Sequence, residues 1–230
     1  PRPVAAVQAV TDVSFTVGER EVLGIAGESG SGKTTIGRSV LRLVEPSSGE
    51  IVFDGDDITR LGSAELRAFR RRCQIVFQDP FSALNPKKTI ERILAEPFIV
   101  QGLAASAAER RERIAELLDL VALGPDFMER MPHELSGGQR QRIVIARAIA
   151  SEPRFIVADE PISALDVSIQ AQIVALLKEL KDRLGLSILF ISHDLAVMEY
   201  LSDRIAVVYL GRVMEIGPAS TICGTPHHPY

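Results

Sequence analysis

The stretch Gly27–Thr34 constrains the fold of this chain more than any other, because it matches the pattern G-x-x-x-x-G-K-[ST]. It follows the apolar run Val22–Ala26, which is typical of a strand buried on both faces, and it precedes a helical pattern. Its glycines let the backbone wrap around an anion, and the following helix presents its positive end to that anion. This context favours a nucleotide phosphate site over a glycine-rich turn that holds a lysine by chance.

Side chains of the loop add to its backbone. Lys33 is expected to reach the β- and γ-phosphates as a point charge, and the hydroxyl of Thr34 is expected to ligate Mg²⁺. The predicted nucleotide-binding residues of this segment are Gly27, Glu28, Ser29, Gly30, Ser31, Gly32, Lys33, Thr34 and Thr35.

A second apolar run, Phe155–Ala158, ends in two acidic residues. Ligands of α/β proteins bind at the carboxyl ends of such buried parallel strands. We expect Asp159 to hold the magnesium, directly or through water, and Glu160 to polarise a water for in-line attack on the γ-phosphate. The alternative is a pair of solvated carboxylates that cap a loop, and the phosphate loop upstream favours the catalytic interpretation.

A second anion-binding helix start is predicted at Ser136, Gly137, Gly138 and Gln139. Ser136 is a plausible N-cap, and the two glycines leave backbone amides bare for close approach. One triphosphate has little need of two cradles from one chain, whereas two chains facing head to tail could each offer one to the other's nucleotide. In isolation, this motif is most often only a helix cap.

Short β-branched runs alternate with helical patterns along the chain, which indicates an α/β fold. We expect strands at Val13–Val17, Val22–Ala26, Ile51–Phe53, Ile75–Phe77, Phe155–Ala158, Leu186–Ile191 and Ile205–Tyr209, and helices at Ala104–Leu123, Gly137–Ala150 and Ile169–Leu184. The segment between the expected strand Ile75–Phe77 and the expected helix Gly137–Ala150 shows no strand signal, and Pro80, Pro86 and Pro97 break it. The expected organisation is one domain over 1–230, with a core of about 1–78 and 140–230 and a helical insertion of about 79–139.

Composition narrows the class of protein. The formal net charge of −4 gives no basic field that would draw the chain to nucleic acid, so we expect no nucleic-acid partner. The longest apolar runs are far shorter than a membrane span, and two cysteines suggest a reducing compartment. We expect a soluble cytosolic protein. Because the sequence opens abruptly on Pro1 and stops on Tyr230, we also expect an excerpt of a longer chain.

With these motifs in this order, the chain resembles the nucleotide-binding subunit of an ATP-binding-cassette (ABC) transporter, essentially from end to end. The resemblance implies that Gly27–Thr34 is the Walker A loop and that Ser136–Gln139 is the family signature. It also implies that Asp159 belongs to Walker B and that Glu160 is the catalytic carboxylate.

The same resemblance implies roles for three further residues. Gln78 corresponds to the Q-loop glutamine, which can bind Mg²⁺ or the attacking water while the segment after it moves. His193 corresponds to the switch histidine, which can hydrogen-bond the γ-phosphate and Glu160. Asp166 closes the D-loop and would face a partner chain, although it is equally compatible with an N-cap of the following helix.

The implied fold is α/β, a P-loop NTPase of ABC type. It has a mixed central sheet flanked by helices, an N-terminal antiparallel β-region and a helical subdomain insertion. The implied cofactors are ATP and Mg²⁺. The implied partners are a second cassette, transmembrane permease subunits and, indirectly, a substrate-binding protein, with the chain peripheral on the inner face of the cell membrane.

The aromatic residue on which this family stacks adenine has no match in residues 1–7, so adenine would pack near Val4 or on a residue upstream.

Three segments narrow the cargo by resemblance. Phe77–Pro86, Ser163–Gln172 and Pro226–Tyr230 are similar to those of oligopeptide and dipeptide importer ATPases, and nickel importers share them. The competing class is a soluble ABC ATPase of DNA repair or translation, which would usually carry coiled coils, zinc modules or basic linkers. A phosphate-loop kinase would have no use for Ser136–Gln139. The expected function is therefore ATP hydrolysis that powers import, most simply of peptides, through ATP-driven dimerisation of two cassettes.

Overall fold

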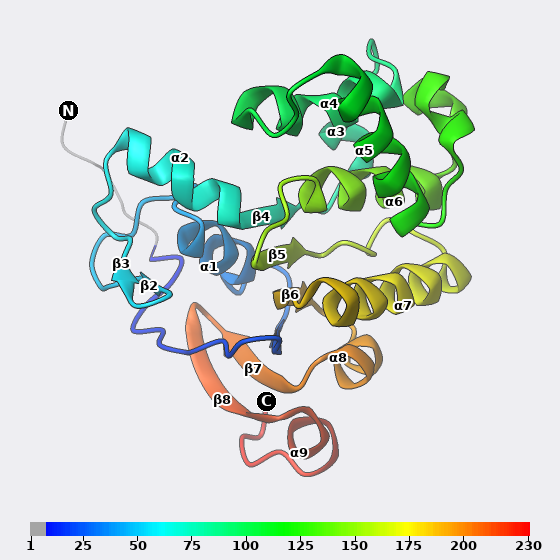
Figure 1. The fold of residues 1–230 in the computed structure, drawn as a ribbon. Helices are drawn as coiled ribbons and strands as arrows, with labels where there is room; N and C mark the ends of the chain where they lie inside the picture. Colours follow the sequence, from blue (N-terminus) through cyan, green and yellow to red (C-terminus); the bar gives the residue numbers. More distant parts are fainter. Residues whose placement is uncertain (1–7) are drawn as a thin grey trace, which may run out of the picture.

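The computed structural model describes residues 8–230, and a six-stranded sheet runs through its centre (Figure 1). The strand order is β4 (Cys73–Val76), β5 (Phe155–Asp159), β6 (Ser187–Ser192), β1 (Val22–Ala26), β7 (Arg204–Tyr209), β8 (Arg212–Pro218). The first five strands are parallel, and β8 pairs with β7 in the antiparallel sense at the edge. This mixed sheet confirms the predicted fold class.

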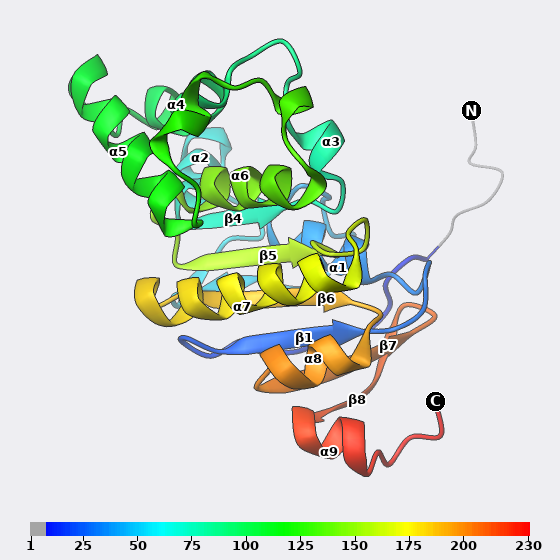
Figure 2. The same cartoon turned by 90° about the vertical axis from the view of Figure 1, so that its right-hand side faces the viewer.

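The register of the parallel strands brings the functional loops to one edge of the sheet. Ala26 pairs with Ser192, and Asp159 pairs with Ile191. Every residue of β1 and β5 is buried, as expected for strands covered on both faces. The loops that follow β1, β4, β5 and β6 therefore leave the sheet on the same side, toward which the arrows point in Figure 2.

Helices cover both faces of the sheet. One face carries α1 (Lys33–Val40) and α2 (Ser63–Arg72), whose buried residues Ile36 and Phe69 join the smaller of two apolar clusters. The other face carries α6 (Gly137–Ile149), α7 (Val167–Leu184) and α8 (Leu195–Leu201), which contribute to the larger cluster. A last helix, α9 (Ala219–Gly224), packs beside β8.

The segment between β4 and α6 contains only helices. These are α3 (Pro80–Ala83), α4 (Ile90–Gln101), α5 (Ala107–Leu120) and the 3-10 turns Pro125–Glu129 and Pro132–Glu134. They gather beyond the β4 edge of the sheet in both views (Figures 1 and 2). This arrangement supports our proposal of a helical subdomain over about 79–139 within one domain.

Two local predictions were wrong. Val13–Val17 forms no strand. Its inward residues alternate as a strand's would and pack on the smaller apolar cluster, but no neighbour within residues 8–230 pairs with its backbone. The antiparallel region near the N-terminus is instead the short pair β2 (Val52–Phe53) and β3 (Asp56–Asp57). Pro97 does not break the chain but lies inside α4.

Within residues 8–230, no helix has both the length and the apolar character needed to cross a bilayer.

Candidate nucleotide-binding and hydrolytic site

The phosphate loop between β1 and α1 requires glycine for two distinct reasons. A Cβ at Gly27 would lie 2.2 Å from the carbonyl oxygen of Val208, so no side chain fits there. Gly32 has φ 103°, a left-handed backbone that side chains disfavour, and a Cβ there would meet the carbonyl oxygen of Ala9 at 2.4 Å. The tight wrapping expected from the sequence is thus enforced by neighbouring backbone.

Lys33 closes this loop from the inside. Its Nζ donates hydrogen bonds to the carbonyl oxygens of Gly27 (2.8 Å) and Glu28 (2.7 Å), which leaves one of its three N–H groups for an anion. Burial lowers the pKa of Lys33, and the nearby carboxylates of Glu160 and Asp159 oppose that shift. The buried hydroxyl of Ser31 has no hydrogen-bond partner among the residues that the structure describes. A phosphate group in the loop would supply acceptors for both side chains.

Thr34 and Asp159 form an oxygen-rich pair beside the loop. The Thr34 Oγ1 donates to Asp159 Oδ1 at 2.9 Å, and only 2% of Asp159 is exposed. Burial raises the pKa of Asp159, whereas the hydrogen bond from Thr34 lowers it. A hydroxyl next to a buried carboxylate is the donor set that Mg²⁺ prefers, and a bound cation would offset the cost of burying that charge. These residues fit the expected magnesium site.

Side chains from three other parts of the chain lie close to the carboxylate of Glu160. Gln78 Nε2 donates to its Oε2 at 3.0 Å, and His193 Nδ1 lies 3.7 Å from its Oε1. Lys33 Nζ lies 4.0 Å from the same Oε1. Glu160 also has φ 46°, an uncommon conformation for a residue with a side chain. The loops after β1, β4, β5 and β6 thus meet at one carboxylate.

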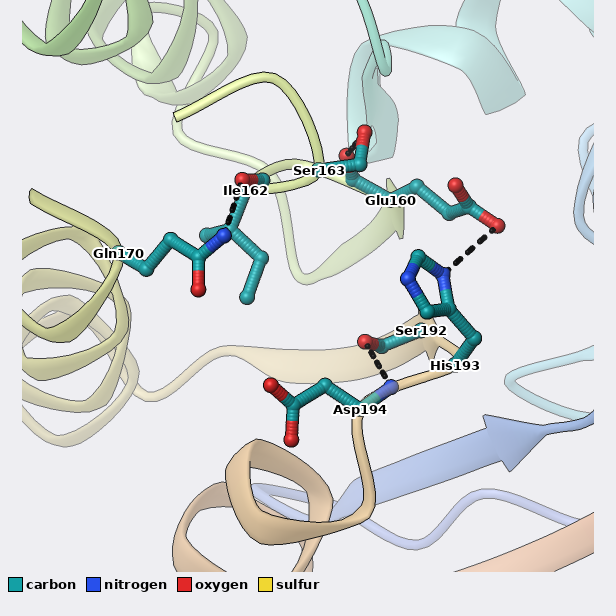
Figure 3. Close-up of a pocket in the computed structure, with 7 residues that line it drawn as sticks. All are labelled: Glu160, Ile162, Ser163, Gln170, Ser192, His193 and Asp194. Atoms are coloured by element: carbon teal, nitrogen blue, oxygen red, sulfur yellow. Dashed lines mark hydrogen bonds and ion pairs between the residues drawn. The ribbon is translucent and has the colours of Figure 1, made fainter. Parts of the chain in front are cut away.

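Glu160 and His193 also line a small pocket (Figure 3). Its lining residues are Glu160, Ile162, Ser163, Gln170, Ser192, His193 and Asp194. Gln170 Nε2 donates to the carbonyl oxygens of Ile162 (3.1 Å) and Leu165 (2.9 Å), which holds the turn after Glu160 in place. Nothing in the sequence pattern singled out Gln170, because an isolated glutamine near the start of a helix carries no distinctive signal.

The helix start predicted at Ser136 is present at the beginning of α6, and its role as a second anion cradle stays a prediction. Ser136 Oγ accepts from the Gln139 amide at 3.3 Å, and Gln139 Oε1 accepts from the Ser136 amide at 3.0 Å, so the two form a capping box. The glycines have a packing role that the sequence did not reveal. A Cβ at Gly138 would lie 2.6 Å from Ile169 Cγ2, and one at Gly137 would lie 3.2 Å from Leu165.

Asp166 occupies the N-cap position of α7, but its side chain makes no capping hydrogen bond and is exposed. No hydrogen bond or ion pair in the part of the chain that the structure describes joins Asp166 or Ser136–Gln139 to the phosphate loop. The structure therefore brings together the loop, Gln78, Asp159, Glu160 and His193. Neither Ser136–Gln139 nor Asp166 is joined to them by a hydrogen bond or ion pair within residues 8–230, and Val4 lies outside the described residues.

Comparisons with known proteins agree on the kind of protein. Residues 10–163 match the family model described as ABC transporter. A Brucella ovis protein, provisionally named a peptide import ATP-binding protein, is 58% identical over 226 residues, which span 98% of this chain and 71% of that protein. The oligopeptide transport ATP-binding protein OppF of Bacillus subtilis is 51% identical, over 99% of this chain and 75% of OppF.

A solved structure shows the same fold. It is described as a dimeric post-hydrolysis state of the ATP-binding cassette MJ0796 bound to ADP and Pi. Its TM-score to this chain is 0.83 and its sequence identity is 34%, over 93% of this chain and 91% of the other.

Proposed function

This chain belongs to the ABC transporter family, and we propose that it is the ATP-hydrolysing subunit of an importer whose cargo is peptides. The observation that carries the proposal is the convergence of Gln78, Lys33 and His193 on the carboxylate of Glu160, next to a loop shaped for phosphate. The cargo is proposed from the names of two relatives, a peptide import ATP-binding protein and an oligopeptide transport ATP-binding protein.

ATP would bind with its β- and γ-phosphates in the loop. The free N–H group of Lys33 and the hydroxyl of Ser31 would donate to phosphate oxygens, together with backbone amides of the loop. Thr34 and Asp159 would hold Mg²⁺, with Gln78 as the further expected ligand. When bound, the ion neutralises charge on the phosphate oxygens.

Glu160 is positioned to act as the general base. A water between its carboxylate and the γ-phosphorus would give up a proton to the carboxylate as its oxygen attacks, and the bond to the ADP oxygen would break. Gln78 and His193 contact different oxygens of Glu160, so they fix the orientation of the carboxylate. Positioning and charge together account for the chemistry expected of this site.

We propose that two cassettes complete the site. In the described part of the chain, Ser136–Gln139 makes no hydrogen bond to the phosphate loop of its own chain. Asp166 and Val167 at the start of α7 are exposed, with Val167 81% exposed. If the helix start at Ser136 closes over the γ-phosphate of a partner's nucleotide, ATP becomes part of the interface. The dimeric relative bound to ADP and Pi supports this arrangement.

We further propose that a membrane-spanning permease docks on the helical subdomain, along Phe81–Lys88 and the adjacent groove. The groove is lined by Gln74, Ile75, Phe77, Glu96, Pro97, Val100, Gln101, Arg147 and Ala148. Two apolar side chains of this surface are exposed: Val100, which lines the groove, is 73% exposed, and Phe81 on the segment is 58% exposed. The Lys88–Glu96 ion pair (2.7 Å) ties the segment to the groove wall. Docking here would hold the cassette on the inner face of the membrane, in the cytoplasm.

Cysteine crosslinking tests this docking surface. With Cys223 replaced by serine and Cys73 left buried, Val100→Cys should crosslink to the permease. Tyr200→Cys on α8, a position that is 56% exposed and does not line the groove, is the matched control. Capture through Tyr200→Cys alone would contradict the assignment.

The transport proposal is tested by uptake into vesicles that contain the cassette, its permease and its substrate-binding protein. We expect ATP-dependent uptake of labelled oligopeptides and none with Glu160→Gln. ATP-dependent uptake of Ni²⁺ without peptide would replace the cargo assignment. ATPase activity that responds to DNA or ribosomes but not to the permease would overturn the importer proposal.

A further inference from the structure

The C-terminal segment Pro226–Tyr230 reaches back to the phosphate loop, from which it is separated by almost the whole sequence. The backbone amide of Glu28 donates a hydrogen bond of 3.2 Å to the hydroxyl of Tyr230. In Figure 2 the last residues rise beside β7 and β8 on the side toward which the parallel strands point. We propose that Tyr230 is a positioning residue for nucleotide binding, which it supports by fixing the phosphate loop at Glu28. This inference rests on the proposed function.

Glu28 links Tyr230 to the cation of the site. While its amide donates to Tyr230, its carbonyl oxygen accepts from Lys33 Nζ at 2.7 Å and from the Ser31 amide at 3.2 Å. The Glu28 amide belongs to the same planar peptide unit as the carbonyl of Gly27, which accepts from Lys33 Nζ at 2.8 Å, so the bond to Tyr230 restrains the orientation of that carbonyl. The Tyr230 hydroxyl therefore stabilises the loop conformation in which Lys33 is held for an anion.

The ring of Tyr230 is itself held in place. It stacks on Tyr209 at the end of β7, with ring centroids 4.6 Å apart and planes tilted by 39°. The turn after Tyr209 also contacts the loop, because the Gly211 amide donates to the Ser31 carbonyl oxygen at 2.9 Å. Two positions of the phosphate loop, Glu28 and Ser31, are thus hydrogen-bonded to residues at or packed against the end of β7.

Glu215 on β8 anchors the segment that carries Tyr230. Its carboxylate accepts from the amide of His228 at 2.8 Å and from that of His227 at 3.0 and 3.1 Å, and these bonds lower the pKa of Glu215. The amide of Tyr230 then donates to His228 Nδ1 at 3.1 Å. The sequence Pro-His-His-Pro-Tyr thereby forms a defined turn that delivers one hydroxyl to the loop.

The test compares two single-hydroxyl deletions by calorimetric titration with Mg²⁺–ADP. Tyr230→Phe keeps the stacked ring but removes the acceptor for Glu28, and it should weaken ADP binding and raise the KM for ATP about 3- to 10-fold, with a smaller change in kcat. Tyr209→Phe removes one hydroxyl from the same pair but leaves the bond to Glu28 in place, so binding should stay at the wild-type level.

A double-mutant cycle separates positioning from a merely structural role. Glu215→Ala releases the turn and should weaken ADP binding in the wild-type background, but it should do so much less when Tyr230 is already phenylalanine. Wild-type ADP affinity in Tyr230→Phe would overturn the inference, whatever its melting temperature, and leave the proposed function intact. Equal effects of Glu215→Ala in both backgrounds would overturn it too. Absence of nucleotide binding by the unmodified chain would overturn both proposals.

Discussion

Thr34 and Asp159, which lie 125 positions apart in the sequence, are joined by a 2.9 Å hydrogen bond from the threonine hydroxyl to the carboxylate. This bond ties the start of α1 to the end of β5, the two elements whose loops would hold the nucleotide and its metal. The carboxylate of Asp159 is buried, and that burial raises its pKa. The buried carboxylate and the neighbouring hydroxyl therefore form a site suited to a cation.

The first prediction concerns Asp159→Asn, which keeps an acceptor for Thr34 but removes the charge. Because the pKa of Asp159 is raised in the fold, its contribution to stability is greatest below the usual carboxyl range and is lost as pH rises through the folded pKa. At pH 7 the nucleotide-free variant should therefore melt at or above the wild-type temperature. Added Mg²⁺–ADP should stabilise the wild type much more than the variant. A clearly lower melting temperature of the nucleotide-free variant would contradict this account.

The second prediction separates binding from chemistry. Lys33→Ala removes the cation of the loop and should weaken ATP binding. Glu160→Gln keeps the shape and the contact with Gln78 but removes the base, so ATP should still bind while hydrolysis falls by ~10²–10⁴-fold. Calorimetric titration and phosphate release measure the two quantities. Equal losses of binding in both variants would invalidate the assigned roles.

The third prediction concerns Gly138. Its substitution by alanine would place a Cβ 2.6 Å from Ile169 Cγ2, and the resulting overpacking between α6 and α7 should cost about 1–3 kcal/mol of unfolding free energy. In an Ile169→Ala background, which lacks that methyl group, the same substitution should cost much less. Additive costs, measured by urea unfolding, would show that Ile169 is not the obstacle.

The fourth prediction concerns Ser136→Ala at the start of α6. Unlike the substitution of Gly138, this change removes a hydroxyl and adds no atom. Loss of the cap should cost about 0.5–2 kcal/mol of stability. Because the helix start is proposed to serve a partner's nucleotide, hydrolysis should fall much more than nucleotide binding to the single chain. Thr89→Ala, which removes the corresponding N-cap of α4, is the matched control and should leave hydrolysis per folded chain unchanged. A similar loss in both variants would point to stability alone.

The sequence predicted the buried parts of this fold well and the amphipathic or edge parts poorly. The apolar runs became β1, β5, β6 and β7, because strands buried on both faces leave a continuous hydrophobic signal. The edge strand β8 escaped detection because it carries Arg212, Glu215 and Pro218. Helix α2 escaped because only Phe69 of its residues is buried.

The candidate site shows the same division. Short motifs next to predicted strand ends located the phosphate loop and the acidic pair, since parallel strands bring their carboxyl ends to one edge. Gln170 and Tyr230 were not predicted, because their contacts form only when the chain is folded and no local sequence pattern marks them. Tyr230, for example, lies 202 positions from Glu28 in the sequence. Similarly, the sequence favours a break at Pro97, because a proline alone does not reveal whether a helix tolerates it, whereas Pro97 lies inside α4.

The central claim is that hydrolysis requires two cassettes, and the most direct test is the ATPase rate per chain across a dilution series. Mass photometry on the same samples gives the fraction of dimer. We predict that the rate per chain falls on dilution in parallel with that fraction. A rate per chain that stays constant down to concentrations at which only monomer is present would contradict the shared site.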